Sequence, residues 1–384
     1  MIYHFFPHYR GPVVEALAQS QVAHFTFVGD DHEYLHSIEP AKLSGKVDVR
    51  LAPTHLLVKP FMWQWGAVTH AVSRECDTVI MHAVPHWPCT WLGGLLARML
   101  GKRVLFWGHG HLYRPRGLKG LLRRLFYAIP HEHLVYGRMA KAHAVATGWP
   151  PEKVHVIYNS LDVKQQVEIR NRLGRAGVAA TRQSLFGDAT TPVMICTTRL
   201  IALRGIDLLL RAAARLGAMG TPVNVVLVGD GPERERLQAL ARELGVQVHF
   251  EGACYREERI AQLMLASNVT VAPGKVGLTA MHSLIYGVPV VTHGNADDQM
   301  PEFEAVIPGV TGSLFEQGDL ESLVTAIRPW VQVGEPPLAT RLACQGLIER
   351  FWNPEYQRRA IERAVRGLPA DDLFDLRPAD GVGP

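Results

Sequence analysis

Two arginines in the second half of the chain stand where side chains could hold a phosphate group. Arg199 follows a short apolar run, Pro192–Thr197, that is typical of a buried strand, and Arg204 comes five residues later. A parallel strand delivers the side chains at its carboxyl end to the ligand-binding edge of a sheet. Two guanidinium groups there clamp a diphosphate through charge-assisted hydrogen bonds. Arg204 taken alone is better explained as a solvated surface arginine, and the pair favours a site.

A glycine loop further along the chain has the pattern of an anion-binding turn. The run Val269–Ala272 predicts a strand, Gly274 and Gly277 interrupt regular structure, and Thr279–Tyr286 predicts a helix. A loop of this kind leaves backbone N–H groups free at the positive end of a helix dipole, which suits a phosphate. A plain turn between strand and helix has the same pattern, and most such turns bind nothing.

Other motifs carry weaker signals. The tight turn Val228–Pro232 contains two glycines, which backbone geometry explains best. Two His-x-His pairs, His109/His111 and His131/His133, lack a nearby third ligand and are therefore weak zinc sites.

Composition indicates a globular enzyme of two domains. The chain has 384 residues, of which 47% are hydrophobic and 20% charged, and the net charge of +4 gives no indication of a nucleic-acid partner. Five scattered cysteines without C-x-x-C predict reduced thiols and a cytoplasmic protein. The sequence begins without the pattern of a signal peptide, and no window approaches 18 continuous apolar residues.

Predicted strands and helices alternate in both halves of the chain. This alternation predicts an α/β fold of two Rossmann-like domains facing across a cleft. Strands are expected in the first half at 2–6, 23–28, 47–51, 78–82, 104–107, 144–146 and 154–157, and helices at 12–20, 59–74, 90–100 and 119–127. In the second half, strands are expected at 192–197, 224–228, 246–251, 269–272 and 288–292, and helices at 205–219, 233–244, 257–266, 279–286, 320–330 and 351–366.

The domain boundaries follow from this alternation and from composition. We expect an N-terminal domain at 1–165 and a C-terminal domain at 166–350. The helix 351–366 is expected to pack back near the first domain, and 367–384 to form a disordered tail. Fifteen of the 18 histidines precede residue 160, which supports two domains with different ligands.

The ordered set of motifs in the second half resembles the family-four retaining glycosyltransferases, which have the two-domain GT-B fold. The segments that carry the resemblance are 198–210, 226–237, 248–252 and 277–291. In the first half the likeness is looser and rests on the segments 9–12, 106–110 and 156–160.

The resemblance implies transfer of a sugar from a nucleotide-sugar donor to an acceptor with retention of configuration. It also implies that 166–350 is the nucleotide-sugar-binding domain and 1–165 the acceptor-binding domain. By matching position, Arg199 and Arg204 hold the donor diphosphate and stabilise the charge that grows on the leaving group. Backbone N–H groups of Gly277, Leu278 and Thr279 complete the cradle, and Gly11 belongs to the family's first glycine loop.

His109 matches a family histidine near the donor sugar, and a histidine lining the core or the acceptor site is the alternative. The chain has no Asp-x-Asp, the motif that metal-dependent glycosyltransferases of the other major fold use to hold a cation. The arginines would neutralise the diphosphate instead, so we expect neither a cofactor nor a metal.

One departure from the family concerns two glutamates that are usually eight positions apart. Gly274 and His282 stand in their places. A neutral His282 could accept hydrogen bonds from the nucleotide ribose as the second glutamate does, whereas a cationic histidine could only donate. Lys275 could fill the space of the first glutamate or reinforce the arginines, and an exposed loop lysine is nearly as good an explanation. The donor sugar is therefore less certain than the reaction class.

The segment 114–141 is strongly basic, with Glu132 as its single acid. Its basic residues are Arg114, Arg116, Lys119, Arg123, Arg124, Arg138 and Lys141, and its apolar stripe is Leu118, Leu121, Leu122, Leu125 and Phe126. A basic amphipathic helix lies on an anionic membrane surface, and this would suit a peripheral enzyme with a lipid-linked acceptor. The alternative is a helix that packs its leucines into the core.

The expected role is synthesis of a cell-surface polysaccharide, lipopolysaccharide or glycolipid, with a glycan or lipid-linked acceptor. Two other functions remain open. A non-catalytic sugar-nucleotide-binding protein would explain the missing glutamates, and Arg199, Arg204 and His109 count against it. A sugar-nucleotide epimerase of the same fold is disfavoured by the motifs at 198–210 and 277–291.

Overall fold

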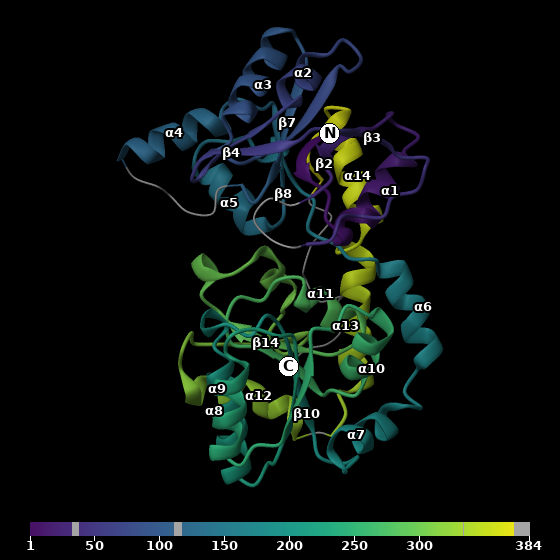
Figure 1. Ribbon diagram of the computed structural model, residues 1–384, viewed down its shortest axis with the longest axis vertical. Coiled ribbons are helices and arrows are strands. Elements are labelled where there is room, and N and C mark those ends of the chain that lie inside the picture. The colour runs from purple at the N-terminus through teal and green to yellow at the C-terminus, as the bar shows by residue number, and fades with distance from the viewer. Residues whose placement is uncertain (33–37, 111–116, 333, 372–384) are drawn as a thin grey trace. The chain divides into compact units, whose positions relative to one another are not determined.

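The structure is a computed structural model that describes residues 1–32, 38–110, 117–332 and 334–371. Its contacts divide the chain into two compact units (Figure 1). Unit 1 comprises residues 1–160 and the chain from Pro354 onward, and unit 2 comprises Leu161–Asn353. No helix of the described residues is long and apolar enough to cross a membrane.

Unit 1 is built on a parallel sheet with the strand order β3-β2-β1-β6-β7-β8-β9. The strands are β1 (Ile2–Phe5), β2 (Thr26–Asp30), β3 (Asp48–Leu51), β6 (Thr78–His82), β7 (Arg103–Gly108), β8 (Glu132–Val135) and β9 (Val154–Val156). A separate antiparallel hairpin consists of β4 (Thr54–Val58) and β5 (Phe61–Gln64). The helices are α1 (Gly11–Ala18), α2 (Ala67–Val72), α3 (Pro88–Met99), α4 (Gly117–Tyr127), α5 (Arg138–Ala146) and α14 (Pro354–Val365).

Helices cover both faces of the unit 1 sheet because its strands are apolar on both sides. One core cluster joins α2, α3 and α4 to the strands through residues such as Ala71, Ala97 and Phe126. The other joins α1 and α14 to the opposite face, with Leu17 and Ile361 fully buried. The last described helix therefore contributes to the core of the first strands of the chain.

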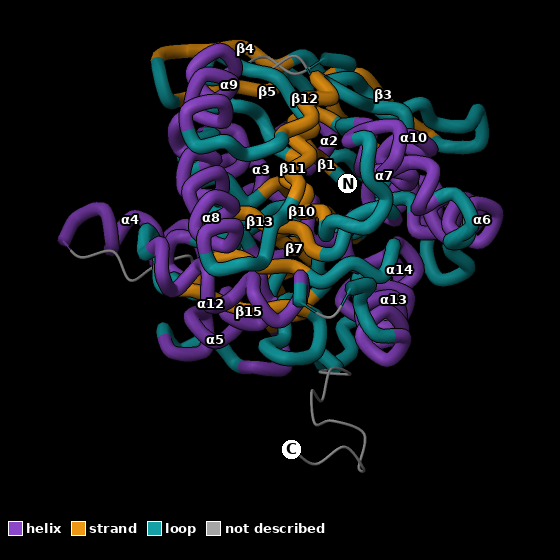
Figure 2. The backbone as a smooth tube through the Cα atoms, turned by 90° about the horizontal axis from the view of Figure 1, so that it is seen from below, coloured by secondary structure: helices purple, strands orange, loops and turns teal. Residues whose placement is uncertain are grey.

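Unit 2 repeats this plan with the strand order β12-β11-β10-β13-β14-β15. Its strands are β10 (Val193–Thr197), β11 (Asn224–Val228), β12 (Val248–Gly252), β13 (Val269–Ala272), β14 (Val290–His293) and β15 (Gly312–Phe315). Its helices are α6 (Val163–Leu173), α7 (Val178–Phe186), α8 (Ile206–Ala218), α9 (Arg234–Glu243), α10 (Glu257–Leu265), α11 (Thr279–Ile285), α12 (Leu320–Val331) and α13 (Leu338–Phe351). Figure 2 shows α8, α9 and α12 on one side of this sheet and α7, α10 and α13 on the other.

Each sheet has a point where the strand order reverses. In unit 2 the chain runs outward from β10 to β12, then returns to pair β13 with the other side of β10. In unit 1 the corresponding neighbours are β1 and β6. Loops diverge at the carboxyl ends of such strand pairs, and ligands of open α/β sheets bind there. These two sheet edges are therefore the expected positions of a ligand-binding site.

Two expectations about the first half are wrong. Residues 144–146 were expected to form a strand and instead lie in α5, since a short apolar run fits a buried helix as well as a strand. The expected helix 59–74 contains β5 and the short helix α2, because the aromatic residues Phe61–Gln64 pair with β4 across a tight turn. The paired strands at 54–64, the strand β8 and the helix α13 were not expected.

Candidate functional site

The predicted arginine pair lies at the carboxyl edge of β10, the central strand of unit 2. The chain leaves this strand at Thr198, whose N–H donates to the Val228 carbonyl, and the Leu200 N–H donates to the Asp230 carbonyl at 3.0 Å. The backbone around Arg199 is thus fixed to the loop after β11. Arg199 itself is exposed, and Arg204 is half-buried.

Arg204 joins its own loop to the glycine loop after β13. Its Nη1 donates to the Lys275 carbonyl at 3.1 Å, and its own carbonyl accepts the Gly274 N–H at 3.1 Å. Its Nε is buried without a partner. The structure therefore brings the predicted Arg204 and the predicted glycine loop together at the point where the strand order reverses.

The start of α11 is fixed to the same edge. Thr279 Oγ1 donates to the Thr197 carbonyl at 2.9 Å, which links the first residue of this helix to the last residue of β10. Within the described part of the chain, the backbone N–H groups of Gly277, Leu278 and Thr279 have no acceptor. A Cβ added at Gly277 would meet open space. These free donors sit in the loop as the sequence predicts.

Lys275 has a partner of its own. Its Nζ lies 2.6 Å from Asp298 Oδ1, and both side chains are about half exposed. The hydrogen bond from Lys275, and then that from Gln317, hold the pKa of Asp298 below its ordinary value. Asp298 thus neutralises much of the Lys275 charge, so Lys275 is a weaker candidate for the diphosphate than the sequence implied.

The glycines of the turn after β11 serve backbone geometry, as expected. A Cβ at Gly229 would lie 1.9 Å from the Thr198 carbonyl oxygen, and one at Gly231 would lie 2.3 Å from that of Leu200. Both glycines therefore let this turn pack directly against the chain on either side of Arg199.

Gly274 leaves no room for the glutamate that the family usually has there. A Cβ at this position would lie 2.9 Å from the Leu203 carbonyl oxygen and 3.1 Å from the Arg204 Cα. Because these are backbone atoms, a side chain would require the Arg204 loop to move. The space next to Gly274 is therefore occupied by the backbone of the Arg204 loop.

His282, in place of the second glutamate, is paired with a carboxylate from another helix. Its Nε2 lies 3.0 Å from Oε2 of Glu257, the first residue of α10. The other oxygen of Glu257 accepts hydrogen bonds from Tyr286 at 2.6 Å and from Gln166 at 3.1 Å. One carboxylate thus holds three side chains.

The charge of Glu257 determines which ring nitrogen of His282 carries a hydrogen. Burial raises the pKa of Glu257, but the hydrogen bonds from His282, Tyr286 and Gln166 outweigh it, so the net pKa is lowered. An ionised carboxylate only accepts, so the His282 Nε2 carries the hydrogen. A neutral His282 then has an acceptor lone pair on Nδ1, the chemistry that the missing glutamate would supply.

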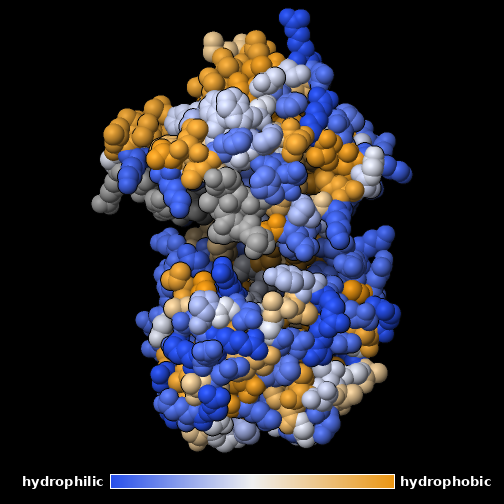
Figure 3. All heavy atoms as spheres, viewed as in Figure 1, coloured by the Kyte–Doolittle hydropathy of each residue, from blue (hydrophilic) through white to orange (hydrophobic). Residues whose placement is uncertain are grey.

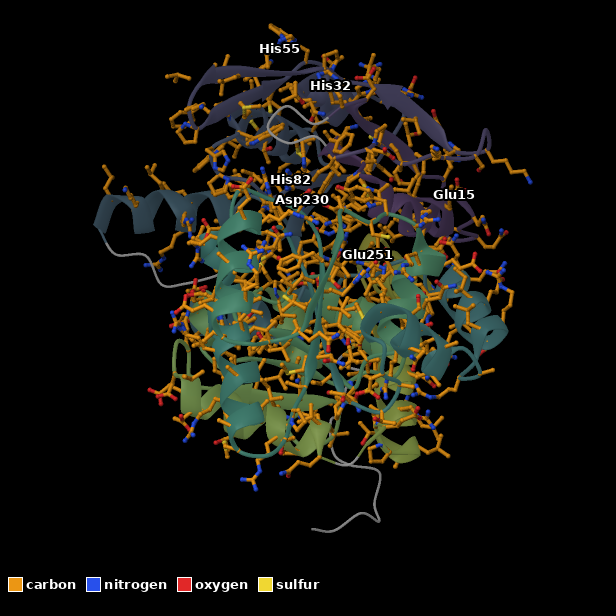
Figure 4. All side chains as sticks on the ribbon, turned by 60° about the horizontal axis from the view of Figure 1, so that its bottom comes forward. Glu15, His32, His55, His82, Asp230 and Glu251 are labelled. Carbon is orange, nitrogen blue, oxygen red and sulfur yellow. The ribbon has the colours of Figure 1, made fainter. Side chains whose placement is uncertain are left out.

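A second ion pair fixes α10 to its neighbouring strand. Arg259 donates from Nε and Nη2 to the two oxygens of Glu251 on β12, each at 2.7 Å, and His249 Nε2 lies 2.8 Å from Glu251 Oε2. Figure 4 labels Glu251 and Asp230 in unit 2. These contacts hold the helix that carries Glu257 in register with the sheet.

The two site residues predicted in unit 1 lie at the carboxyl ends of its strands. Gly11 begins α1 with a right-handed backbone, and a Cβ there would meet only Ala41 at an ordinary 3.6 Å. His109 directly follows β7, is exposed, and lies 5.0 Å from the Tyr136 ring. Desolvation first and the Arg10 charge second lower the pKa of His109.

Two of the histidines considered as metal ligands make other contacts. His131 Nδ1 accepts the Val104 N–H at 3.0 Å, and His133 Nε2 lies 3.2 Å from the Tyr127 carbonyl. His111 lies outside the described residues. Among those described, Asp30, Asp31 and His32 place three ligand atoms close together (His32 is labelled in Figure 4), and Asp30 also accepts the Thr54 N–H.

The basic segment 114–141 is divided among α4, β8 and α5, and Arg114 and Arg116 lie outside the described residues. On α4 the leucines face outward: Leu118, Leu121, Leu122 and Leu125 are 73%, 54%, 48% and 52% exposed. Phe126 and Tyr127 of the same helix are buried instead. The alternative that these leucines pack into the core is therefore wrong. Figure 3 shows hydrophobic side chains gathered over α4.

Sequence reasoning missed Glu257 and Asp298. Tyr286 lies one helical turn after His282, so the sequence alone predicts that the two side chains share a helix face. Nothing in the sequence connects Glu257 to His282, because the contact depends on how α10 packs against α11.

Comparison with known proteins finds a family match within unit 2. Residues 179–343 match the family described as Glycosyl transferases group 1. The matched segment contains Arg199, Arg204, the glycine loop and the His282–Glu257 pair.

Curated relatives match about half of the chain. A GDP-mannose-dependent alpha-(1-6)-phosphatidylinositol monomannoside mannosyltransferase of Mycolicibacterium smegmatis is 28% identical over 185 residues, 45% of this chain and 46% of that protein. The lipopolysaccharide core biosynthesis glycosyltransferase LpsE of Rhizobium meliloti is 29% identical over 220 residues, 55% of this chain and 60% of that protein. The chain thus spans about half the length of the curated relatives it matches.

Solved structures resemble nearly the whole chain. The lipopolysaccharide outer core galactosyltransferase WaaB, in its apo form, has a TM-score of 0.68 at 15% identity and covers 95% of this chain and 98% of its own. Anabaena HepE in complex with UDP and glucose has a TM-score of 0.60 at 16% identity, with 96% and 99% covered. The fold class is that of the GT-B glycosyltransferases, as predicted.

Proposed function

We propose that this protein is a retaining glycosyltransferase of the hexosyltransferase type that uses a nucleotide-sugar donor. One observation carries the proposal: the loop of Arg204 is hydrogen-bonded to the glycine loop at Lys275 and Gly274, at the strand reversal of a group 1 glycosyltransferase domain. Arg199 and Arg204 bind the donor diphosphate and stabilise the charge on the departing nucleotide.

The remaining site residues complete the donor site. The free N–H groups of Gly277, Leu278 and Thr279 donate hydrogen bonds to a phosphate oxygen, and His282 accepts a hydrogen bond from the nucleotide through Nδ1. His109 and Gly11 contribute from unit 1, as the family resemblance implies. The diphosphate is neutralised by arginine in this proposal, so the reaction needs neither a metal ion nor a cofactor.

The proposed acceptor is a glycan or a lipid-linked sugar. Two relatives support this, one named for a phosphatidylinositol monomannoside and the other for the lipopolysaccharide core. The product would belong to a cell-surface polysaccharide, lipopolysaccharide or glycolipid.

The outward leucines of α4 supply the surface for such an acceptor: we propose that α4 lies on an anionic membrane. Lys119 and Arg124 flank the leucines and are exposed, and the sequence has no acidic residue between Asp77 and Glu132. Leu95 and Met99 of the neighbouring α3 are exposed as well. Apolar insertion together with uncompensated basic charge fits the boundary of an anionic bilayer.

A non-catalytic sugar-nucleotide-binding protein is the competing function, and the backbone-filled space at Gly274 is the observation in its favour. A panel of UDP-, GDP- and dTDP-sugars separates the two. Release of nucleotide from one donor, raised by a lipid-linked or glycan acceptor, supports the transferase, and the anomeric configuration of the product tests retention. Tight binding of a donor without any turnover would establish the binding protein instead.

A further inference from the structure

Unit 1 has a buried arginine at its own strand reversal, surrounded by aromatic rings and unbonded polar atoms. The strands β1, β6, β7 and β8 are neighbours in the sheet, and their carboxyl ends meet at one edge. Arg10 follows β1, His82 ends β6, Trp107 lies near the end of β7, and Tyr136 follows β8. Figure 4 labels His82 at this edge.

Arg10 is a buried cation without an anionic partner. Its side chain is only 6% exposed, and its guanidinium carbon lies 5.0, 5.1 and 5.2 Å from the ring centroids of Tyr3, Trp107 and Tyr136. Nη2 donates to the Tyr136 hydroxyl. Nε and Nη1 are buried without any hydrogen-bond partner, and no carboxylate of the described residues pairs with the guanidinium. Ring contacts offset part of the cost of burial, but they leave these N–H groups unsatisfied.

Further polar atoms without partners surround it. His4 Nδ1, His82 Nδ1 and Trp107 Nε1 are buried and unbonded, and the rings of His4 and His82 lie 4.6 Å apart. Burial first and the Arg10 charge second lower the pKa of His4 to about 4, so the histidines are neutral and Arg10 carries the charge. Buried polar groups in proteins are ordinarily hydrogen-bonded, so the unbonded groups gathered at this edge are available to a polar ligand.

We propose that this edge of unit 1 binds an oxyanion, a phosphate or carboxylate group, with Arg10 as its counter-charge. The unbonded Nε and Nη1 of Arg10 and the indole N–H of Trp107 are the donors. Helix α1 begins at Gly11, directly after Arg10, so its dipole adds to the attraction. The strand reversal is the expected place for such a ligand.

The same chemistry could come from two sources. One is an acidic substituent on the acceptor, and the other is the phosphate of the nucleotide-sugar donor. The oxyanion site does not depend on the proposed transferase activity, since binding and melting measurements need no turnover.

The test compares Arg10→Met with a matched substitution elsewhere. Methionine keeps the length of the side chain and removes its charge. Arg182→Met is the control, because Arg182 is equally buried but donates to the Ala266 carbonyl at 2.7 Å and to Asn268 Oδ1 at 3.0 Å. Melting temperatures of the full chain are measured with inorganic phosphate, sn-glycerol 3-phosphate or glucuronate, and with sodium chloride at the same ionic strength.

We expect one of these anions to raise the melting temperature of the wild type and of Arg182→Met by about 3 °C at ten times its Kd. Arg10→Met should lose this rise, and without anion it should melt no lower than the wild type, whereas Arg182→Met should melt lower. An equal response of Arg10→Met and wild type overturns the proposal. If Arg10→Met does not fold, Trp107→Phe decides: a weaker anion response supports the site, and an unchanged one overturns it.

The source of the anion follows from nucleotide binding. A Kd for UDP or GDP that rises about tenfold in Arg10→Met assigns the site to the donor phosphate. An unchanged nucleotide Kd, together with an Arg10-dependent response to glycerol phosphate or glucuronate, assigns it to the acceptor.

Discussion

His282 Nε2 lies 3.0 Å from Glu257 Oε2, so a histidine that replaces a family carboxylate is itself held by a carboxylate. Glu257 reaches this position from the first turn of α10, and Tyr286 and Gln166 donate to its other oxygen. The carboxylate beside His282 therefore comes from a second helix rather than from α11 itself.

Replacing Glu257 by glutamine should weaken donor binding. The amide carries hydrogens of its own, so Nε2 of His282 is no longer compelled to donate, and its Nδ1 no longer stays free to accept. Loss of one hydrogen bond between neutral groups costs about 0.5–1.5 kcal/mol, which corresponds to a KM for the donor raised about two- to tenfold. Steady-state kinetics should show this in KM with little change in kcat.

The neighbouring Glu258→Gln is the control, since Glu258 is exposed and pairs only with Arg172 at 3.3 Å. Its kinetic constants should equal those of the wild type. A KM that is the same in both variants would show that Glu257 has no part in holding His282 for the donor.

Arg199 and Arg204 should contribute similarly to kcat/KM but differently to the melting temperature. Arg199→Ala and Arg204→Ala should each lower kcat/KM about a hundredfold, as expected for loss of one charge-stabilising contact in the transition state. Arg204→Ala should also lower the melting temperature because it loses the bond to the Lys275 carbonyl, whereas the exposed Arg199 should not. Arg211→Ala, an exposed arginine on α8, is the control. Unchanged kinetics in both variants would contradict the diphosphate clamp.

Sequence patterns predicted the elements of unit 2 well, since apolar strands, amphipathic helices and glycine turns are local features. They also predicted the loops of Arg199, Arg204 and Gly277. They could not predict the pairing of Lys275 with Asp298 or of His282 with Glu257, since these contacts join segments that only the folded chain brings together.

The leucines of α4 illustrate a different limit of sequence reading. A stripe at helical spacing shows that one face is apolar, but it does not show which face meets the core. Here Phe126 of that stripe and Tyr127 are buried in the core, while Leu118 and Leu122 remain exposed.

The ion pair that fixes α10 should make stability depend on acid. The hydrogen bonds from Arg259 first, and then from His249, lower the pKa of Glu251 from 4.5 to about 2 in the folded protein. A lowered pKa stabilises the fold above the ordinary pKa, and this stabilisation is lost as pH falls from about 4.5 toward about 2. Glu251→Gln should therefore reduce the free energy of unfolding at pH 7 by about 1–2 kcal/mol and flatten its decline in acid.

Urea unfolding at pH 7, 4 and 3 measures this difference. Glu243→Gln, at an exposed position on α9, should leave both the free energy of unfolding and its pH dependence unchanged. An equally steep acid decline in Glu251→Gln and the wild type would contradict the role of this pair.

Vesicle binding should depend on the outward face of α4. The variant Leu118→Gln/Leu122→Gln should reduce co-sedimentation with phosphatidylcholine vesicles that contain about a third of anionic lipid, because it removes the inserted apolar surface. Lys119→Glu/Arg124→Glu should reduce it through charge, and binding of the wild type should fall as salt screens that charge.

Leu338→Gln/Leu342→Gln on α13 is the matched control, since these leucines are 61% and 57% exposed and lie four residues apart, as Leu118 and Leu122 do. Equal binding of the α4 and α13 variants, or binding that is indifferent to salt, would show that α4 is not the membrane contact. A concentration-dependent dimer that the α4 leucine variant abolishes would identify a second copy of the chain as the partner of this face.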